Sequence, residues 1–94
     1  MSEYINLSVG RAPGGNWDYE FSNGSPVTLE EALDRNLREP GENGESFSVE
    51  DLIAGIEAGR NSVTLNLRKM SPDEWHIHLR DGDKITINGK LKGN

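Results

Sequence analysis

The chain has 94 residues and a net charge of -6, and 33% of its residues are hydrophobic, so we expect one small domain, residues 1–94, with a thin core. It contains no cysteine, which excludes disulfide scaffolds, cysteine-ligated metal centres and thiol catalysis. The acidic balance argues against direct binding to nucleic acid or to an anionic membrane, and no apolar run approaches the length of a membrane span.

Two alternating segments near the N-terminus predict an antiparallel hairpin. Residues 4–9 and 17–21 alternate between apolar and polar side chains, which is typical of half-buried strands. The Gly- and Pro-rich residues 10–16 join them, and this loop lacks the Lys and Ser or Thr of a phosphate-binding loop. We assign the aromatic side chains of the second segment to the core, and an exposed aromatic stripe for binding is the alternative. These residues are Trp17, Tyr19 and Phe21.

Helical periodicity follows in the middle of the chain. Apolar residues recur at helical spacing over 29–37 and again over 49–58, which predicts two amphipathic helices. Thr28 and Glu31 have the spacing of a capping box, in which each side chain bonds a free backbone N–H of the other residue. Ser48 is the expected N-cap of the second helix.

Alternation returns in the last third and predicts strands over 63–69, 75–80 and 84–88. The sequence Met70-Ser71-Pro72-Asp73 forms the first turn between them, and Asp81-Gly82-Asp83 forms the second. The predicted order of elements is therefore ββααβββ. This order indicates an α+β fold in which one sheet packs on one or two helices.

One stretch also carries a family pattern. A strand ending in Leu65-Asn66, a Pro-Asp-Glu-Trp link at residues 72–75 and an Asp-Gly-Asp turn before the last strand follow one another. Over residues 62–88 the chain thereby resembles the sulfur-carrier β-grasp family of ThiS/MoaD type. The resemblance implies a β-grasp-like mixed sheet and a carrier that is adenylated at a terminal Gly-Gly. This sequence ends in Lys92-Gly93-Asn94, so we expect no adenylation by an activating enzyme.

The charge is concentrated in the middle of the chain. Residues 30–57 hold nine acidic and two basic side chains, whereas residues 58–94 hold four acidic and seven basic ones. We expect the acidic stretch to bind a basic surface on a partner protein by charge complementarity, and a solvated helix surface is the alternative. The expected contact residues are Glu39, Glu42, Glu45, Glu50 and Asp51. A second acidic cluster consists of Glu30, Glu31 and Asp34.

No residue pattern points to catalysis or to a cofactor. His76 and His78 would share one face of a strand, but a third and a fourth metal ligand are not evident, so we predict no metal site. The sequence therefore favours a non-catalytic, cytoplasmic protein-binding module, such as an inhibitor of a nuclease or another nucleic-acid-binding protein. A β-grasp adaptor derived from ubiquitin-like or sulfur-carrier proteins, or a subunit of a larger assembly, is the alternative. The sequence is also compatible with a homo-oligomer.

Overall fold

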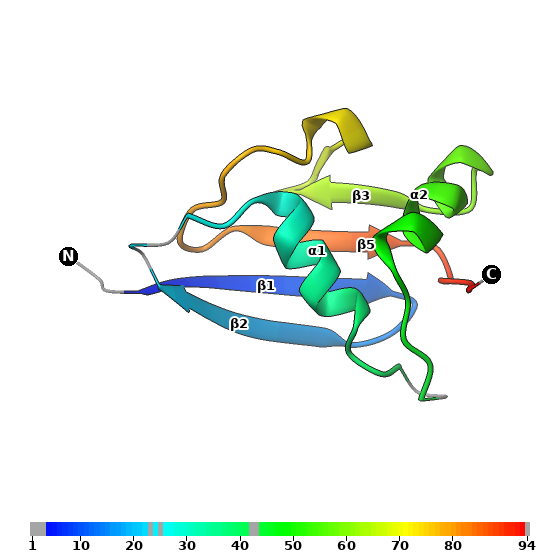
Figure 1. The fold of residues 1–94 in the computed structure, drawn as a ribbon, viewed down its shortest axis with the longest axis horizontal. Coiled ribbons are helices and arrows are strands. Elements are labelled where there is room, and N and C mark those ends of the chain that lie inside the picture. Colours follow the sequence, from blue (N-terminus) through cyan, green and yellow to red (C-terminus); the bar gives the residue numbers. More distant parts are fainter. Residues whose placement is uncertain (1–3, 23, 25, 42–43, 94) are drawn as a thin grey trace.

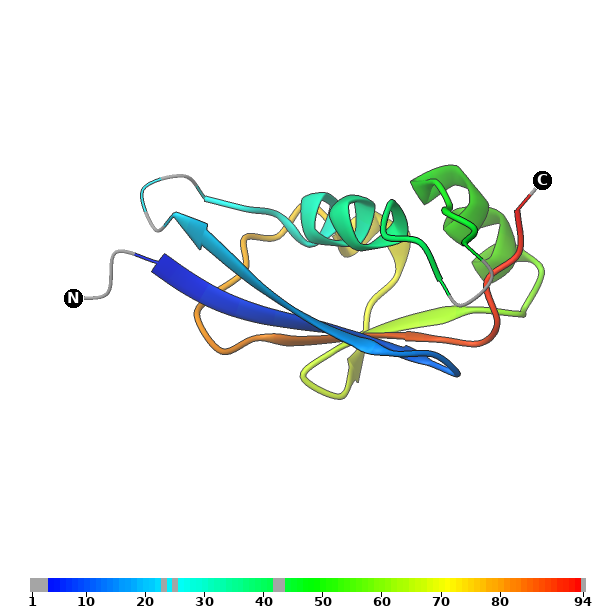
Figure 2. The ribbon, with the colours of Figure 1, turned by 90° about the horizontal axis from the view of Figure 1, so that it is seen from below.

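The fold is a mixed sheet with two helices across one face, seen in a computed structural model that describes residues 4–22, 24, 26–41 and 44–93 (Figures 1 and 2). Within these residues the strands lie in the order β2-β1-β5-β3-β4. The elements are β1 (Tyr4–Ala12), β2 (Asn16–Ser22), α1 (Leu29–Leu37), α2 (Val49–Glu57), β3 (Ser62–Leu65), β4 (Arg68–Lys69), a 3-10 turn η1 (Pro72–Glu74) and β5 (Lys84–Asn88).

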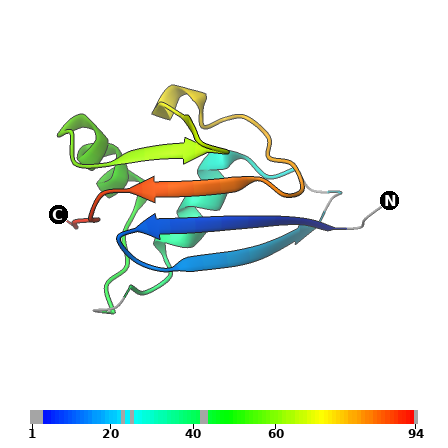
Figure 3. The same cartoon turned by 180° about the vertical axis from the view of Figure 1, so that it is seen from behind.

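The strand directions make the sheet β-grasp-like. β1 runs antiparallel to β2, with Tyr4 opposite Ser22 and Gly10 opposite Asn16. β1 runs parallel to β5, and β5 runs antiparallel to β3. The crossover between the parallel strands β1 and β5 contains both helices, so they cover one face while the other stays bare (Figure 3). The predicted α+β class is therefore confirmed.

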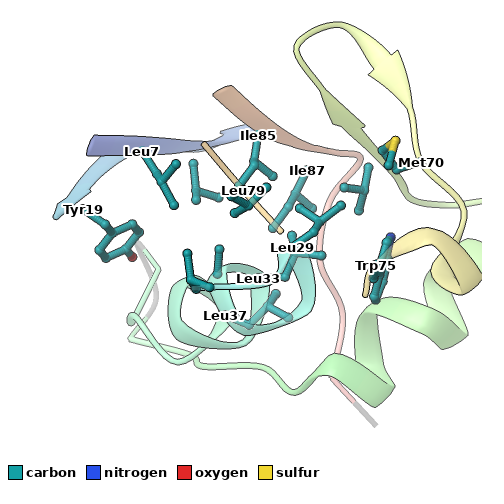
Figure 4. Close-up of a cluster of buried hydrophobic side chains, with 14 of the residues drawn as sticks. Leu7, Tyr19, Leu29, Leu33, Leu37, Met70, Trp75, Leu79, Ile85 and Ile87 are labelled. Carbon is teal, nitrogen blue, oxygen red and sulfur yellow. The ribbon is translucent and has the colours of Figure 1, made fainter. Parts of the chain in front are cut away.

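The core lies between the sheet and α1 (Figure 4). The two-residue period of the strands turns apolar side chains such as Val9 and Ile87 toward the helices, and both are fully buried. The helical spacing of Leu29, Leu33 and Leu37 places all three on the facing side of α1, where they are also fully buried. The bare face carries exposed polar residues, which include Asn6, Asp18, Glu20 and Lys84.

Both predicted helices form, and both begin with a capping box. Thr28 Oγ1 accepts a 3.2 Å hydrogen bond from Glu31 N, and Glu31 Oε1 accepts one of 3.2 Å from Thr28 N. Ser48 and Asp51 make the same reciprocal pair before α2. In the described part of the chain, neither helix is long and apolar enough to cross a membrane.

The strand predicted over 63–69 is in fact two strands. Asn66 and Leu67 both adopt positive φ angles, of 51° and 71°, which reverses the chain between β3 and β4. The tight turn falls where no glycine marks it, so the alternating pattern alone did not separate the two strands.

The prediction of a strand over residues 75–80 is wrong. The 3-10 turn η1 precedes an irregular segment whose carbonyl groups bond the start of α1 instead of a neighbouring strand. The carbonyl oxygen of Trp75 accepts from Glu30 N, and that of Ile77 accepts from Leu29 N, both at 3.0 Å. Because the first N–H groups of a helix have no intrahelical acceptors, this segment satisfies two of them.

Candidate binding groove

The β1–β2 hairpin, the segment between α1 and α2 and the segment after β5 come together at one end of the sheet (Figure 1). Residues of these three parts line two adjoining hollows. Their volumes are about 600 Å³ on the hairpin side and about 680 Å³ on the C-terminal side. Four residues line both hollows, and we call the combined surface the groove. The shared residues are Glu45, Phe47, Lys90 and Leu91.

The hairpin loop leaves the hairpin-side hollow open because its wall contains glycines. Gly14 has a φ of 145°, and a Cβ atom there would lie 2.9 Å from Arg11 Cβ. A Cβ atom on Gly15 would lie 3.4 Å from the ring of Trp17. A side chain is therefore disfavoured at Gly14, whereas a Cβ atom on Gly15 would make an ordinary van der Waals contact with Trp17.

Arg11 is the central polar residue of the groove. Its side chain is 9% exposed, and its Nε donates a 2.9 Å hydrogen bond to Asn36 Oδ1. Its Nη2 donates to the carbonyl oxygens of Asn36 and Glu39 at the end of α1. The guanidinium carbon lies 4.5 Å from the centre of the Trp17 ring, a cation–π contact that fixes its plane.

The remaining nitrogen of Arg11, Nη1, lies beside Gly41 in the lining of the hairpin-side hollow. Within the described residues, Nη1 has no hydrogen-bond acceptor, and no carboxylate lies within ion-pair distance of the guanidinium. Nη1 lies 3.6 Å from the place that a Cβ on Gly41 would take, and Gly41 lines the same hollow as Arg11. Burial lowers the pKa of Arg11, and the nearby Tyr19 and Glu39 act in the opposite direction.

Asn36 holds Arg11 in place from the helix side. It is fully buried on α1, and its Nδ2 donates a 3.1 Å hydrogen bond to the Tyr19 hydroxyl. Burial raises the pKa of Tyr19, while the hydrogen bond from Asn36 lowers it. The three side chains form a buried polar network that joins β1, β2 and α1 directly behind the groove.

The groove is locally positive although the chain is acidic. Four basic side chains line it against one described carboxylate, that of Glu45. Phe47 and Leu91 are half-buried and supply apolar surface beside them, as does Trp17. The basic residues are Arg11, Arg60, Lys90 and Lys92. This combination suits an anionic group attached to an apolar one.

The acidic residues expected to contact a partner are divided among different roles. Glu45 and Glu50 are exposed. Asp51 accepts a 2.9 Å hydrogen bond from Ser48 N in the second capping box, and Glu39 is half-buried with its carbonyl oxygen bonded by Arg11. Glu42 lies outside the described residues.

The second acidic cluster serves α1 itself. Glu31 belongs to the first capping box, and Asp34 lies 3.2 Å from Arg38 one helical turn later. Glu30 is exposed. Two of the three carboxylates therefore have partners within the same helix.

The aromatic residues of β2 divide between the core and the groove. Tyr19 is buried in the core, as expected, and Phe21 packs half-buried beside it with ring centres 6.3 Å apart. Trp17 packs against the core but also forms one wall of the groove. The sequence analysis assigned Trp17 to the core and kept a binding role for the aromatic stripe as the alternative; the structure gives Trp17 a place in both the packing and the groove wall.

The two histidines are not among the residues that line the groove. His76 and His78 are both exposed, and the strand that was to align them does not form. His76 Nδ1 lies 3.0 Å from the carbonyl oxygen of Asp73. Among the described residues, no three His, Asp or Glu side chains are grouped so that they could hold a metal ion.

Comparisons with known proteins add one structural likeness. No family model matches the sequence, and no curated protein matches it. Among solved structures, the chain is similar to a protein from Ruminococcus gnavus ATCC 29149 described as a "putative metal binding protein". The two share 18% sequence identity with a TM-score of 0.47, over 97% of this chain and 99% of that one. A likeness at this level carries no argument about function.

Proposed function

We propose that this protein is a non-catalytic module that binds another protein, and that the groove receives an acidic segment of that partner. The observation that carries the proposal is the state of Arg11. Its nearly buried guanidinium lines an open hollow, and no described carboxylate lies within ion-pair distance of it.

Electrostatics supports an anionic occupant. A buried charge without a counter-ion is costly, and the carbonyl groups at the end of α1 compensate that cost only in part. Lys90, Lys92 and Arg60 extend the positive potential along the groove, which would speed the approach of an acidic segment. Tryptophan and arginine side chains are also enriched among the residues that dominate binding energy in protein interfaces.

The lining side chains are better suited to binding than to proton transfer. No histidine occurs among the described lining residues, and Glu45 is their sole carboxylate. General acid–base catalysis usually relies on a positioned histidine or carboxylate close to the reacting atoms. We therefore propose recognition rather than catalysis at this surface.

Nuclear magnetic resonance titration tests the proposal with two blocked peptides. The acidic probe is acetyl-Gly-Glu-Phe-Glu-Gly-amide, and its basic counterpart carries Lys in place of Glu. We expect the acidic peptide to shift the amide signals of Gly15, Gly41 and Leu91 and the indole signal of Trp17, with weaker binding as salt rises.

A charge-reversal pair supplies the matched control. Lys90→Glu places a carboxylate in the groove and should weaken the acidic peptide's binding by about tenfold. Lys69→Glu makes the same change of net charge. Lys69 lies on β4 and lines neither hollow, so this variant should leave binding nearly unchanged. Equal binding of the acidic and basic peptides, or equal effects of the two variants, would contradict the proposal.

This protein's own acidic stretch, within residues 30–57, offers a second candidate surface. It would bind a basic partner such as a nuclease or another nucleic-acid-binding protein. The exposed carboxylates of Glu45 and Glu50 favour it. The same titration separates the two surfaces, because the basic peptide should then shift the amides around Glu50. The double variant Glu45→Lys/Glu50→Lys should abolish those shifts and leave the domain folded, since both residues are exposed.

A further inference from the structure

Building on the proposed function, we propose that the group recognised in the groove is the free C-terminal carboxylate of a partner protein whose last residue is apolar. This inference specifies which acidic segment the groove would accept. It follows from the hydrogen bonds of Arg11, from the size and lining of the hairpin-side hollow and from the position of the lysines.

The donors of Arg11 are largely used inside the protein. Nε bonds Asn36 Oδ1, and Nη2 bonds two carbonyl oxygens at the end of α1. A bidentate contact, in which two guanidinium nitrogens bond the two oxygens of one carboxylate, needs two adjacent nitrogens with free N–H groups. Arg11 does not have such a pair, because Nε and Nη2 bond acceptors within the protein. Within the residues that the structure describes, only Nη1 has no acceptor, so Arg11 offers one oriented contact from this nitrogen to one oxygen of the ligand.

The position of that contact is fixed before any ligand arrives. Asn36 is fully buried and is itself held by the Tyr19 hydroxyl. Trp17 stacks on the guanidinium at 4.5 Å. A preorganised donor loses little conformational entropy on binding, so a single hydrogen bond to a charged group can set specificity.

The hollow that Arg11 lines has the dimensions of a small-ligand site. Its volume is about 600 Å³, within the range of roughly 300–1,000 Å³ that small-molecule sites occupy. Its walls include Trp17, Phe47 and Leu91. A terminal residue carries its carboxylate and its apolar side chain on the same Cα atom, so it can reach Nη1 and these walls together. A segment within a chain would have to pass both of its ends out of the hollow.

The lysines extend the same argument outward. Lys90 lines both hollows, and Lys92 and Arg60 line the C-terminal-side hollow. Within the described residues, none of these three side chains has an ion-pair partner. They are free to meet the second carboxylate oxygen and acidic residues that precede the terminus.

Three peptides of similar size test the inference by the same titration. The first, acetyl-Gly-Ser-Gly-Phe, ends in a free carboxylate, and the second is its C-terminal amide. The third, acetyl-Gly-Ser-Glu-Phe-amide, restores the negative charge as an internal side chain. We expect the free acid to bind at least about tenfold more tightly than either amide. Only its terminal carboxylate can bond Nη1 while the Phe side chain contacts the apolar walls.

Variants locate the effect at Arg11 and Lys90. Arg11→Lys should remove most of the preference for the free acid over its amide, and thermal unfolding checks that this variant is folded. Since Arg11 also bonds the end of α1, Lys90→Gln serves as an independent variant that should reduce the preference, with Lys69→Gln as its control. The comparison of the three peptides uses the wild-type protein, so it does not depend on whether any variant folds.

The outcomes separate the two proposals. Equal binding of the free acid and its amide would overturn the terminal-carboxylate inference. If the acid shows no advantage while acetyl-Gly-Glu-Phe-Glu-Gly-amide binds at the groove, the inference fails and the proposed function stands. If none of the acidic peptides shifts the groove signals, the proposed function fails with it.

Discussion

Asn36 Oδ1 accepts a 2.9 Å hydrogen bond from Arg11 Nε in a region closed to solvent. The same amide donates to the Tyr19 hydroxyl through Nδ2, so one helix residue connects two neighbouring strands. Nothing in the apolar core alone would fix the helix end relative to the hairpin so specifically, because dispersion contacts have little directional preference.

Asn36→Ala should therefore destabilise the protein. It leaves Arg11 Nε and the Tyr19 hydroxyl without their partner, and a buried unsatisfied polar group costs about 1–3 kcal/mol. We expect a loss of about 2–4 kcal/mol in the free energy of unfolding, measured by urea denaturation. Asn16→Ala, at an exposed position of β2, should change it by less than about 0.5 kcal/mol. Similar midpoints for the two variants would show that the network contributes no stability.

Gly55→Ala should destabilise the protein, although alanine is normally the better helix former. A Cβ atom at this position of α2 would lie 1.8 Å from Asn61 Oδ1, closer than any tolerated contact. The helix-propensity gain of about 1 kcal/mol is thereby outweighed by overpacking. Gly55→Ala combined with Asn61→Ala should recover part of the loss in a double-mutant cycle. Strict additivity of the two changes would mean that the clash is not the cause.

Leu67→Gly should stabilise the protein. Leu67 is 96% exposed, so it contributes almost no burial, and it has a φ of 71°. The left-handed conformation costs a side-chain-bearing residue about 1–2 kcal/mol, and glycine avoids that cost. Thermal unfolding should show a higher melting temperature, whereas Leu65→Gly in the neighbouring strand should lower it. An unchanged or lower melting temperature for Leu67→Gly would contradict this account.

Alkaline pH should weaken the fold through Tyr19. Burial raises the pKa of its hydroxyl, so the neutral form is favoured in the folded state and ionisation is easier in the unfolded chain. The stabilisation is fully present below the ordinary tyrosine pKa of about 10 and is lost as pH rises through the raised value. Urea denaturation between pH 8 and about 11 measures this loss. Tyr19→Phe should flatten the pH profile relative to wild type, and an equally steep profile for this variant would contradict the account.

Local sequence signals predicted most of the fold. The Thr28–Glu31 capping box marked the start of α1, because capping depends on residues three positions apart, and Ser48 alone marked the start of α2 as its N-cap. Alternation failed at residues 75–80, since the buried Trp75 there belongs to a segment that bonds α1 instead of a strand. Such a contact spans more than forty residues, and no local pattern encodes it.

The groove was less predictable for the same reason. Arg11 continues the inward alternation of the preceding strand, so its burial was open to inference, but the Gly- and Pro-rich surroundings favoured a loop. Its partner Asn36 lies 25 residues away on α1 and looks like an ordinary polar helix position. The number of acidic residues in the middle of the chain favoured that stretch as the binding surface. A count of charges does not reveal that Asp51 bonds the backbone at the start of α2.

The bonds from Leu29 and Glu30 to the carbonyl groups of Ile77 and Trp75 also bear on synthesis at the ribosome. A nascent chain that has emerged only through α2 contains every residue of α1 but lacks these two acceptors for its first turn. It also lacks β5, so the sheet face against which α1 packs is incomplete. Stable docking of the helix must then wait until β5 has also left the exit tunnel, so α1 completes its packing only well after its own residues have been synthesised.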